Sequence, residues 1–341
     1  MTAVEGAVPL RHENLTDAAL REVEEAVRLL EAGRLVGLPT ETVYGLAADA
    51  ANDRAVRAIY AAKGRPADHP VIVHVQHRAD PLRWAARLPP SARQLIDAFW
   101  PGPLTLVLPR RSGVAAVCAA GQDTIALRSP AHPLAQAVLR RLHAGEGGLA
   151  APSANRFGRI SPTSADDVRA ELGPALALVL DGGRCAVGIE STIVDCSGAA
   201  PRILRPGGLE ASALAEVLGV DARSLQAPPA AAAPRVPGAL ASHYAPRTPL
   251  RLRSAAAIDA DWPAAAAQVG VLALHARPPG VPAGAQAHWV RLVAEPAACA
   301  RDLYAALRAL DALALQQIWV EEVPPQTAWE AVRDRLRRAA A

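Results

Sequence analysis

The sequence predicts an α/β protein with two domains: a twisted, open mixed sheet with helices, followed by a smaller domain of βαβ type. Strand and helix patterns alternate, yet several strands follow one another directly, which favours a mixed sheet. The 341 residues are about twice the length of a common single domain. A Pro- and Ala-rich stretch interrupts every periodic pattern. We therefore expect one domain over residues 1–225, a linker over 226–249 and a second domain over 250–341.

The first domain combines amphipathic helices with short apolar strands. Thr16 can cap the first helix and Gly33 can end it. The third helix must stop at the sequence WPGP, because proline cannot continue a helix. Helices are expected over residues 17–32, 53–62, 91–99, 134–142 and 209–218. Strands are expected over residues 35–40, 71–75, 104–109 and 124–128, and in the stretches LAAPSAN, LALVLDGG and STIVDC.

The second domain has its own alternation of strands and helices. Strands are expected over residues 250–253, 269–276, 289–292 and 318–323, and helices over 295–315 and 327–340. This order predicts a small βαβ, Rossmann-like domain. It contains neither a G-x-G-x-x-G motif nor a phosphate-binding P-loop.

Composition and charge limit the function classes. Hydrophobic residues make up 51% and charged residues 20%, as in globular proteins. The net charge of +3 suits binding of small anions, but no basic stripe with interleaved aromatics predicts a nucleic-acid surface. The four cysteines match no zinc or disulfide pattern, so reduced, buried thiols are expected. No signal layout and no apolar run of about 18 residues occurs, so we expect a cytoplasmic protein without a membrane span.

The first polar cluster, PTETVYGL, follows a predicted strand directly. It places Thr40, Glu41, Thr42 and Tyr44 within five positions. Such hydroxyls can position a small polar molecule. An ordinary turn followed by a helix cap explains the same residues.

The second cluster, KGRPADHPVIVH, holds Lys63 and Arg65 at a predicted helix end. Two cations on a rigid turn suit a polyphosphate. A basic cap on the helix dipole is the alternative. Strand alternation places His74 on the sheet face opposite Val73 and Val75, and a single histidine in a strand is more often structural than catalytic.

The third cluster, APSANRFGRISPTS, is a loop of small and hydroxyl-bearing residues. Ser153, Asn155, Gly158 and Ser161 can cradle a phosphate or a nucleotide sugar. It is not a Walker A loop, because no GK[ST] follows. A solvent-exposed loop is the alternative.

The fourth cluster joins the stretches GIESTIVDC, ILRPGG and TIALR. Ser191 begins one strand, and Arg205 ends another. Arg128 lies in an apolar strand and needs a partner, because a buried, unpaired cation is costly. A substrate carboxylate, Glu190 and Glu41 are the candidate partners.

Taken together, these stretches identify a protein family far more specifically than any one of them does. PTETVYGL, KGRP with a downstream VH, FWPGPLTLVL, TIALR, APSAN with SPT, and STIVD with ILRPG resemble the YrdC-type domain in order and spacing, over residues 15–210. A further domain follows a Pro-rich linker that contains HYAP. The chain therefore resembles the long, two-domain form of the L-threonylcarbamoyladenylate synthase family.

The resemblance implies an enzyme, a nucleotidyltransferase with a YrdC-like fold and a concave, positively charged groove. It implies conversion of L-threonine, bicarbonate and ATP into threonylcarbamoyl-AMP and diphosphate, the first step of threonylcarbamoyl-adenosine formation in tRNA. Mg²⁺ is expected to arrive with ATP, without a metal site made of protein side chains. The expected downstream partner is a tRNA threonylcarbamoyl-transferase complex, contacted transiently, with weak or no direct tRNA binding.

The resemblance also implies site residues. The K-x-R and S-x-N pairs of the family assign catalysis to Lys63, Arg65, Ser153 and Asn155. The L-threonine site is expected at Thr42, His74, Arg128, Ala151 and Ser191. The ATP site is expected at Arg65, His69, Thr124, Ser153, Ser161, Arg205 and Tyr244. Because Tyr244 lies in the linker, the linker is expected to act as a lid.

Two departures and two alternatives accompany the resemblance. His69 stands where the family usually has asparagine, and the linker reads PGALASHYAP instead of a basic, aromatic run before HYAP. An RNA-binding YrdC-like module without synthase activity is one alternative, but the intact K-x-R, S-x-N and Arg205 set favours catalysis. A carbamoyl transferase of the hydrogenase-maturation type should carry zinc-finger cysteine pairs and an acylphosphatase region, and this sequence has neither.

Overall fold

A computed structural model describes residues 15–226, 233–278 and 288–341. In the first domain its strands are β1 (Val36–Leu38), β2 (Gly45–Asp49), β3 (Val73–His74), β4 (Leu104–Pro109), β5 (Thr124–Arg128), β6 (Leu149–Ala150), β7 (Leu178–Val179), β8 (Thr192–Asp195) and β9 (Arg202–Arg205). Its helices are α1 (Asp17–Glu31), α2 (Asp53–Lys63), α3 (Pro90–Phe99), α4 (Ala116–Ala119), α5 (Pro133–Arg141), α6 (Ala165–Leu172), α7 (Ala211–Leu218) and α8 (Ala222–Leu225).

The described strands of the first domain form one mixed sheet, in the order β7-β1-β2-β6-β3-β5-β4-β8-β9. Neighbouring pairs are antiparallel at β4·β5 and parallel at β3·β5 and β4·β8. The predicted mixed sheet is therefore confirmed. Parallel pairing also places His74 directly beside Arg128 in register, which brings two separate sequence clusters together.

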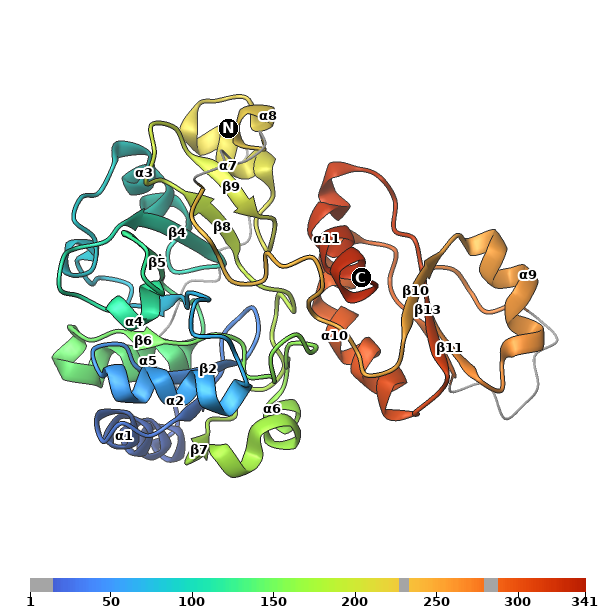
Figure 1. The fold of residues 1–341 in the computed structure, drawn as a ribbon, viewed down its shortest axis with the longest axis horizontal. Coiled ribbons are helices and arrows are strands. Elements are labelled where there is room, and N and C mark those ends of the chain that lie inside the picture. Colours follow the sequence, from blue (N-terminus) through green and yellow to red (C-terminus); the bar gives the residue numbers. More distant parts are fainter. Residues whose placement is uncertain (1–14, 227–232, 279–287) are drawn as a thin grey trace.

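The second domain is smaller and stands to one side of the first (Figure 1). It contains β10 (Leu250–Arg253), α9 (Ala255–Ala265), β11 (Val269–Ala273), β12 (Trp289–Arg291), α10 (Pro296–Ala312), β13 (Gln317–Glu321) and α11 (Glu330–Ala339). The four described strands are parallel, in the order β10-β13-β11-β12, which confirms the βαβ prediction. Figure 1 shows α10 and α11 between this sheet and the first domain, with α9 on the opposite face.

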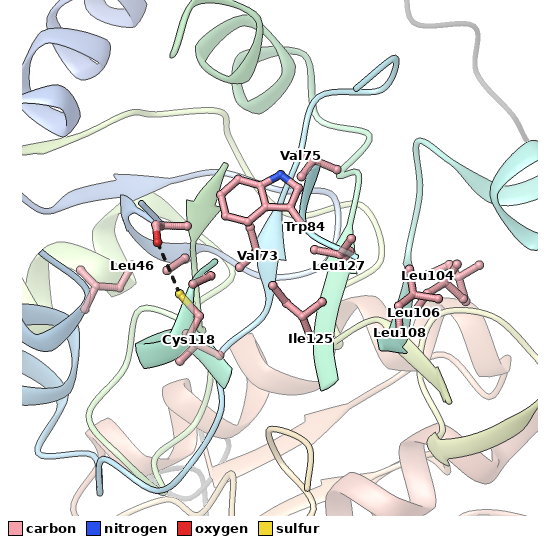
Figure 2. Packing of buried hydrophobic residues seen from close by; sticks show 14 of the residues in the cluster. Leu46, Val73, Val75, Trp84, Leu104, Leu106, Leu108, Cys118, Ile125 and Leu127 are labelled. Carbon is pink, nitrogen blue, oxygen red and sulfur yellow. Dashed lines mark hydrogen bonds between the residues drawn. The ribbon is translucent and has the colours of Figure 1, made fainter. Parts of the chain in front are cut away.

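Strand alternation separates the core of the first domain from its polar face. Leu104, Leu106 and Leu108 of β4 face the core, and Figure 2 shows Val73, Ile125 and Leu127 gathered around Trp84. The residues between them point to the other face of the sheet because successive side chains of a strand alternate. His74, Thr105 and Arg128 therefore lie together on the polar face.

Local signals explain where the helices near this face begin and end. The hydroxyl of Thr16 accepts a hydrogen bond from the backbone N–H of Ala19, so α1 starts where the sequence predicts. Asn52 caps α2 in the same way. Gly64 ends α2 with a φ of +61°, a left-handed conformation that favours glycine. The chain turns there, and Lys63 and Arg65 stand on either side of the turn.

Five described elements were not predicted: β2, α4, α6, α8 and α9. The stretch after PTETVY continues as strand β2, which rules out the alternative of a turn followed by a helix cap, and its five residues are all buried. Helix α6 was not predicted, although Ser164 and Asp167 form a capping box at its start. Helix α9 was not predicted either, because AAAIDADWPAA has no clear apolar face and contains Pro263. Across the described residues, no helix has both the length and the apolarity needed to span a bilayer.

Candidate active site

One cavity opens on the polar face of the first sheet, where the strand ends meet the linker. All the residues predicted for L-threonine line it: Thr42, His74, Arg128, Ala151 and Ser191. Four residues predicted for ATP line it as well: Arg65, Ser153, Arg205 and Tyr244. In the described part of the chain, the remaining predicted residues stand outside this lining: Lys63, His69, Thr124, Asn155 and Ser161.

Arg128 is buried and held by a carboxylate. Its Nη2 lies 2.6 Å from Oε1 of Glu41, and its Nε donates to the carbonyl of Gly102. Oε2 of Glu41 accepts a hydrogen bond from the backbone N–H of Ala131. Of the protein partners that the sequence left open for Arg128, Glu41 is therefore the one present. Glu190 has a different role.

His74 stands beside Arg128 with an unsatisfied nitrogen. Its Nδ1 is buried and has no hydrogen-bond partner among the described residues. Burial, together with the charge of Arg128, lowers the pKa of His74 to about 3. The imidazole is therefore neutral at physiological pH. Its Nδ1 can form a hydrogen bond with a bound molecule without adding a charge to the site.

Hydroxyl groups surround the same end of the cavity. The hydroxyls of Thr40 and Thr42 lie 2.9 Å apart, and Thr40 also donates to the carbonyl of Val43. On the other side, Thr105 and Ser191 pair their hydroxyls at 2.7 Å. These contacts fix the side chains before any ligand binds, which is the preorganisation that a specific polar site needs.

Arg205 joins the end of strand β9 to the linker. Its Nη2 donates to the carbonyl of Ser191, and its Nη1 donates to the carbonyl of Pro237 at 2.9 Å. Its Nε is buried and has no hydrogen-bond partner among the described residues. A buried guanidinium with an unused donor at a cavity wall is suited to an anionic ligand.

Lys63 is buried beneath the third cluster and does not face the cavity. Its ammonium group donates to the carbonyls of Ser153 and Asn155, both at 2.5 Å. Burial, and secondly the charge of Arg65, lowers the pKa of Lys63. The side chain of Asn155 donates to carbonyls within the same loop. The K-x-R and S-x-N pairs are thus physically connected, because Lys63 ties the loop to the end of α2.

Arg65 reaches the cavity from the turn after α2. Its guanidinium donates to the carbonyl of Pro70 at 2.8 Å and lies 5.7 Å from the ring centre of Phe157. His69 packs edge-on against the same ring. Burial, followed by the charge of Arg65, lowers the pKa of His69. Thr124 is half-buried at the start of β5, at the opposite end of that strand from Arg128.

The linker lies over the cavity and contributes four lining residues: Pro237, Gly238, His243 and Tyr244. The backbone N–H of His243 donates to the carbonyl of Arg338 in α11, and that of Ala245 donates to the carbonyl of Gly158. Gly238 has a φ of +73°, and a Cβ atom there would stand 2.0 Å from the hydroxyl oxygen of Tyr244. Glycine is therefore required at 238 for both backbone conformation and space.

Sequence reasoning missed several residues of the cavity. Glu190 lines it, although we considered this residue only as a partner for Arg128. Its place directly before Ser191 in GIEST was the available signal. Pro237 and Gly238 belong to a stretch whose pattern indicates only a linker, so no sequence signal placed them at the site.

Comparisons with known proteins agree with this architecture. Residues 28–207 match the Sua5/YciO/YrdC family model, described as "Telomere recombination", and residues 209–341 match the model of the threonylcarbamoyl-AMP synthase C-terminal domain. The chain is 36% identical to the threonylcarbamoyl-AMP synthase of Bacillus subtilis, covering 94% of this chain and 93% of that protein. It is 35% identical to the enzyme of Pyrococcus abyssi, covering 93% and 94%.

A solved structure is similar over both domains. The crystal structure of P. abyssi Sua5 complexed with L-threonine superposes with a TM-score of 0.81 at 34% identity, covering 94% of each chain. Fold, domain order and relatives all agree. The chain belongs to the Sua5/YrdC family of threonylcarbamoyl-AMP synthases, in its two-domain form.

Proposed function

We propose that this protein is an L-threonylcarbamoyladenylate synthase that acts at the cavity between the first sheet and the linker. The reaction is L-threonine, bicarbonate and ATP to threonylcarbamoyl-AMP and diphosphate. The observation that carries the proposal is the meeting of Arg65, Arg128 and Arg205 with a neutral His74 in one cavity. Such a cavity suits two anionic substrates, a carboxylate and a polyphosphate.

The L-threonine site is proposed at the Arg128 end. A guanidinium has five N–H donors, so Arg128 can keep its contact with Glu41 and still bind the threonine carboxylate. The unsatisfied nitrogen of His74 lies beside it. Thr42, Ser191 and the backbone of Ala151 complete the set. The solved complex of P. abyssi Sua5 with L-threonine supports L-threonine as the ligand.

The ATP site is proposed at the Arg65 and Arg205 end, with Ser153 and Tyr244 in the wall. The further members of the proposed set lie outside the cavity lining: His69, Thr124 and Ser161. Lys63 and Asn155 act here by holding the loop of Ser153 in place. The linker residues are proposed to close over the nucleotide as a lid, as their position against the cavity suggests.

The chemistry requires orientation more than a protein nucleophile. The amine of threonine attacks the carbon of bicarbonate, and water leaves to give a carbamate. An oxygen of the carbamate then attacks the α-phosphorus of ATP, and the bond to the bridging oxygen breaks to release diphosphate. Holding both substrates in one cavity and neutralising their charge with arginines accounts for the rate enhancement.

A divalent cation fits this site only together with ATP. Among the described residues, no group of three or more His, Cys, Asp or Glu is placed to hold a metal ion. Mg²⁺ prefers water and phosphate oxygens with few protein ligands, so ATP would supply its main contacts. When bound, it supplies charge neutralisation at the phosphates. Arg65 and Arg205 are the protein groups that share this task.

The cellular role follows from the proposed product. Because threonylcarbamoyl-AMP serves tRNA modification, we propose a cytoplasmic enzyme that passes its product to a tRNA threonylcarbamoyl-transferase complex through a transient contact. Direct binding of tRNA is proposed to be weak or missing, since the net charge is only +3.

The direct test measures diphosphate release from ATP and Mg²⁺ in bicarbonate buffer, with L-threonine, with L-serine and without amino acid. Release that depends on L-threonine and exceeds release with L-serine is expected. A folded protein that binds ATP but releases no diphosphate would support the RNA-binding alternative instead, and a gel-shift measurement with tRNA would then identify it.

A further inference from the structure

Glu190 lines the proposed ATP cavity, and residues of both domains bind its carboxylate. Ser161 of the first domain donates its hydroxyl to Oε1 at 2.6 Å. Tyr304 of α10 donates to Oε2 at 2.9 Å, and Nε of Arg335 in α11 lies 2.7 Å from the same oxygen. A carboxylate in the wall of the first domain is therefore satisfied by the second domain.

The guanidinium of Arg335 is buried and has several partners besides Glu190. Its side chain is fully buried, and its Nη2 donates to the carbonyl of Pro206, next to Arg205. Its guanidinium lies 5.1 Å from the ring centre of Tyr244, and the ring of Tyr304 stacks on that of Tyr244 at 5.9 Å. The same arginine thus contacts Glu190, the end of β9 and the linker residue that covers the cavity.

The charge of Glu190 needs this partner. Burial alone raises the pKa of Glu190, but the charges of Arg335 and Arg205 outweigh burial and lower the pKa to about 2. The carboxylate is therefore ionised at neutral pH. An ionised carboxylate at the wall of a cavity for ATP repels phosphate groups, and it competes with them for Arg205.

We infer that Arg335, supported by Tyr304, is a positioning residue that the second domain supplies to the nucleotide site of the first. It neutralises and orients Glu190, so that Arg205 stays available to ATP. This assigns the second domain a part in substrate binding and rests on the proposed location of the ATP site. Arg335 itself contacts no reacting atom.

The test compares Arg335→Met, Glu190→Gln and the double variant Glu190→Gln/Arg335→Met with the wild type. Loss of the cation leaves a buried, unpaired carboxylate, so Arg335→Met should raise the KM for ATP about tenfold or more and change the KM for L-threonine less than about threefold. In the double variant residue 190 carries no charge, and Asp334, the other ion-pair partner of Arg335, keeps its contact with Arg338. The KM for ATP should therefore return to within about threefold of the wild type. Arg337→Met, an equal charge change on the exposed side of α11, is the matched control.

A contribution of Arg335 to folding alone predicts a different pattern. It would lower thermal stability without a selective effect on the KM for ATP, and Glu190→Gln would not restore that KM. An unchanged KM for ATP in Arg335→Met, or a double variant no better than this single variant, would overturn the inference. Where Arg335→Met does not fold, the double variant should still have a KM near that of the wild type, and Arg335→Lys, which retains the charge, an intermediate one.

A binding experiment distinguishes failure of the proposed function from failure of this inference. If the wild type releases no diphosphate with L-threonine, the same variants are compared by calorimetric binding of a non-hydrolysable ATP analogue. A wild type that binds the analogue, together with weaker binding by Arg335→Met and recovery in the double variant, supports the inference without synthase activity. Absence of binding by the wild type overturns both.

Discussion

Arg128 and Glu41 form a buried ion pair in which Nη2 and Oε1 are 2.6 Å apart. Arg128 projects from strand β5 and Glu41 from the loop after β1, so the pair connects β5 to that loop beside the cavity. Glu41 is itself fixed by the backbone N–H of Ala131. The guanidinium is therefore oriented before a substrate carboxylate arrives, with further N–H donors available to bind it.

Replacing Arg128 tests the assignment of the carboxylate site. Arg128→Ala should raise the KM for L-threonine about 30-fold or more, since a buried charge-assisted contact of about 2 kcal/mol is lost. The dissociation constant of ATP should stay within about threefold, because Arg128 is not among the proposed nucleotide contacts. Steady-state kinetics and calorimetry measure both. Arg57→Ala, at an exposed position on α2, is the control; equal loss of both affinities in Arg128→Ala would contradict the assignment.

Lys63 should act through the loop it holds. Lys63→Met removes two buried hydrogen bonds, so the free energy of unfolding should fall by about 2 kcal/mol. The kcat/KM for ATP should fall as well, because Ser153 loses its support. Lys63→Arg should not restore either quantity, since a planar guanidinium cannot reach the two carbonyls as a compact ammonium does. Urea unfolding and kinetics decide this; full activity in Lys63→Met would exclude the positioning role.

Gly238 tests the contact between the linker and Tyr244. Gly238→Ala places a Cβ atom against the hydroxyl of Tyr244, whereas Gly219→Ala has the same left-handed strain with nothing within 4 Å. Both should lose about 1 kcal/mol of stability from backbone strain. Only Gly238→Ala should also raise the KM for ATP, because the linker is displaced from Arg205. An equal KM for ATP in the two variants would show that the linker takes no part in nucleotide binding.

The buried His74 gives stability a defined dependence on pH. Its pKa is about 3 in the folded protein and 6.5 in the unfolded chain, so below pH 6.5 only the unfolded chain takes up the proton. Acidification therefore favours unfolding, and between pH 8 and pH 5.5 His74 should remove about 1.4 kcal/mol of stability. His74→Gln lacks this contribution, so its stability should fall by that much less over the same range. Parallel pH curves for the two proteins would show that His74 is not buried and neutral.

Part of this site could be predicted from the sequence because strand alternation is a local property. The pattern VIVHV placed His74 opposite its valine neighbours, and the structure confirms this orientation. TIALR likewise predicted a buried Arg128 in need of a partner. The choice of Glu41 over Glu190 could not be predicted, because it depends on how loops from distant parts of the chain meet in space.

The role of the second domain could not be predicted either, because it also depends on contacts between distant parts of the chain. Arg335 and Glu190 are 145 positions apart. The spacing of α11 places Arg335 on the buried stripe of the helix, but no local signal indicates Glu190 as its partner. Helix α9 was not predicted for a different reason: its alanines and Pro263 show no apolar periodicity. Tertiary packing decides such elements, and local pattern does not reveal it.

The most direct measurement of the central claim follows the carbon of bicarbonate. The wild type is incubated with ATP, Mg²⁺, L-threonine and ¹³C-labelled bicarbonate, and the products are separated and weighed by mass spectrometry. The account predicts an adenylate that contains L-threonine and carries the ¹³C label, formed in step with diphosphate. Diphosphate release without a labelled threonine adenylate, or an adenylate that lacks the label, would contradict it.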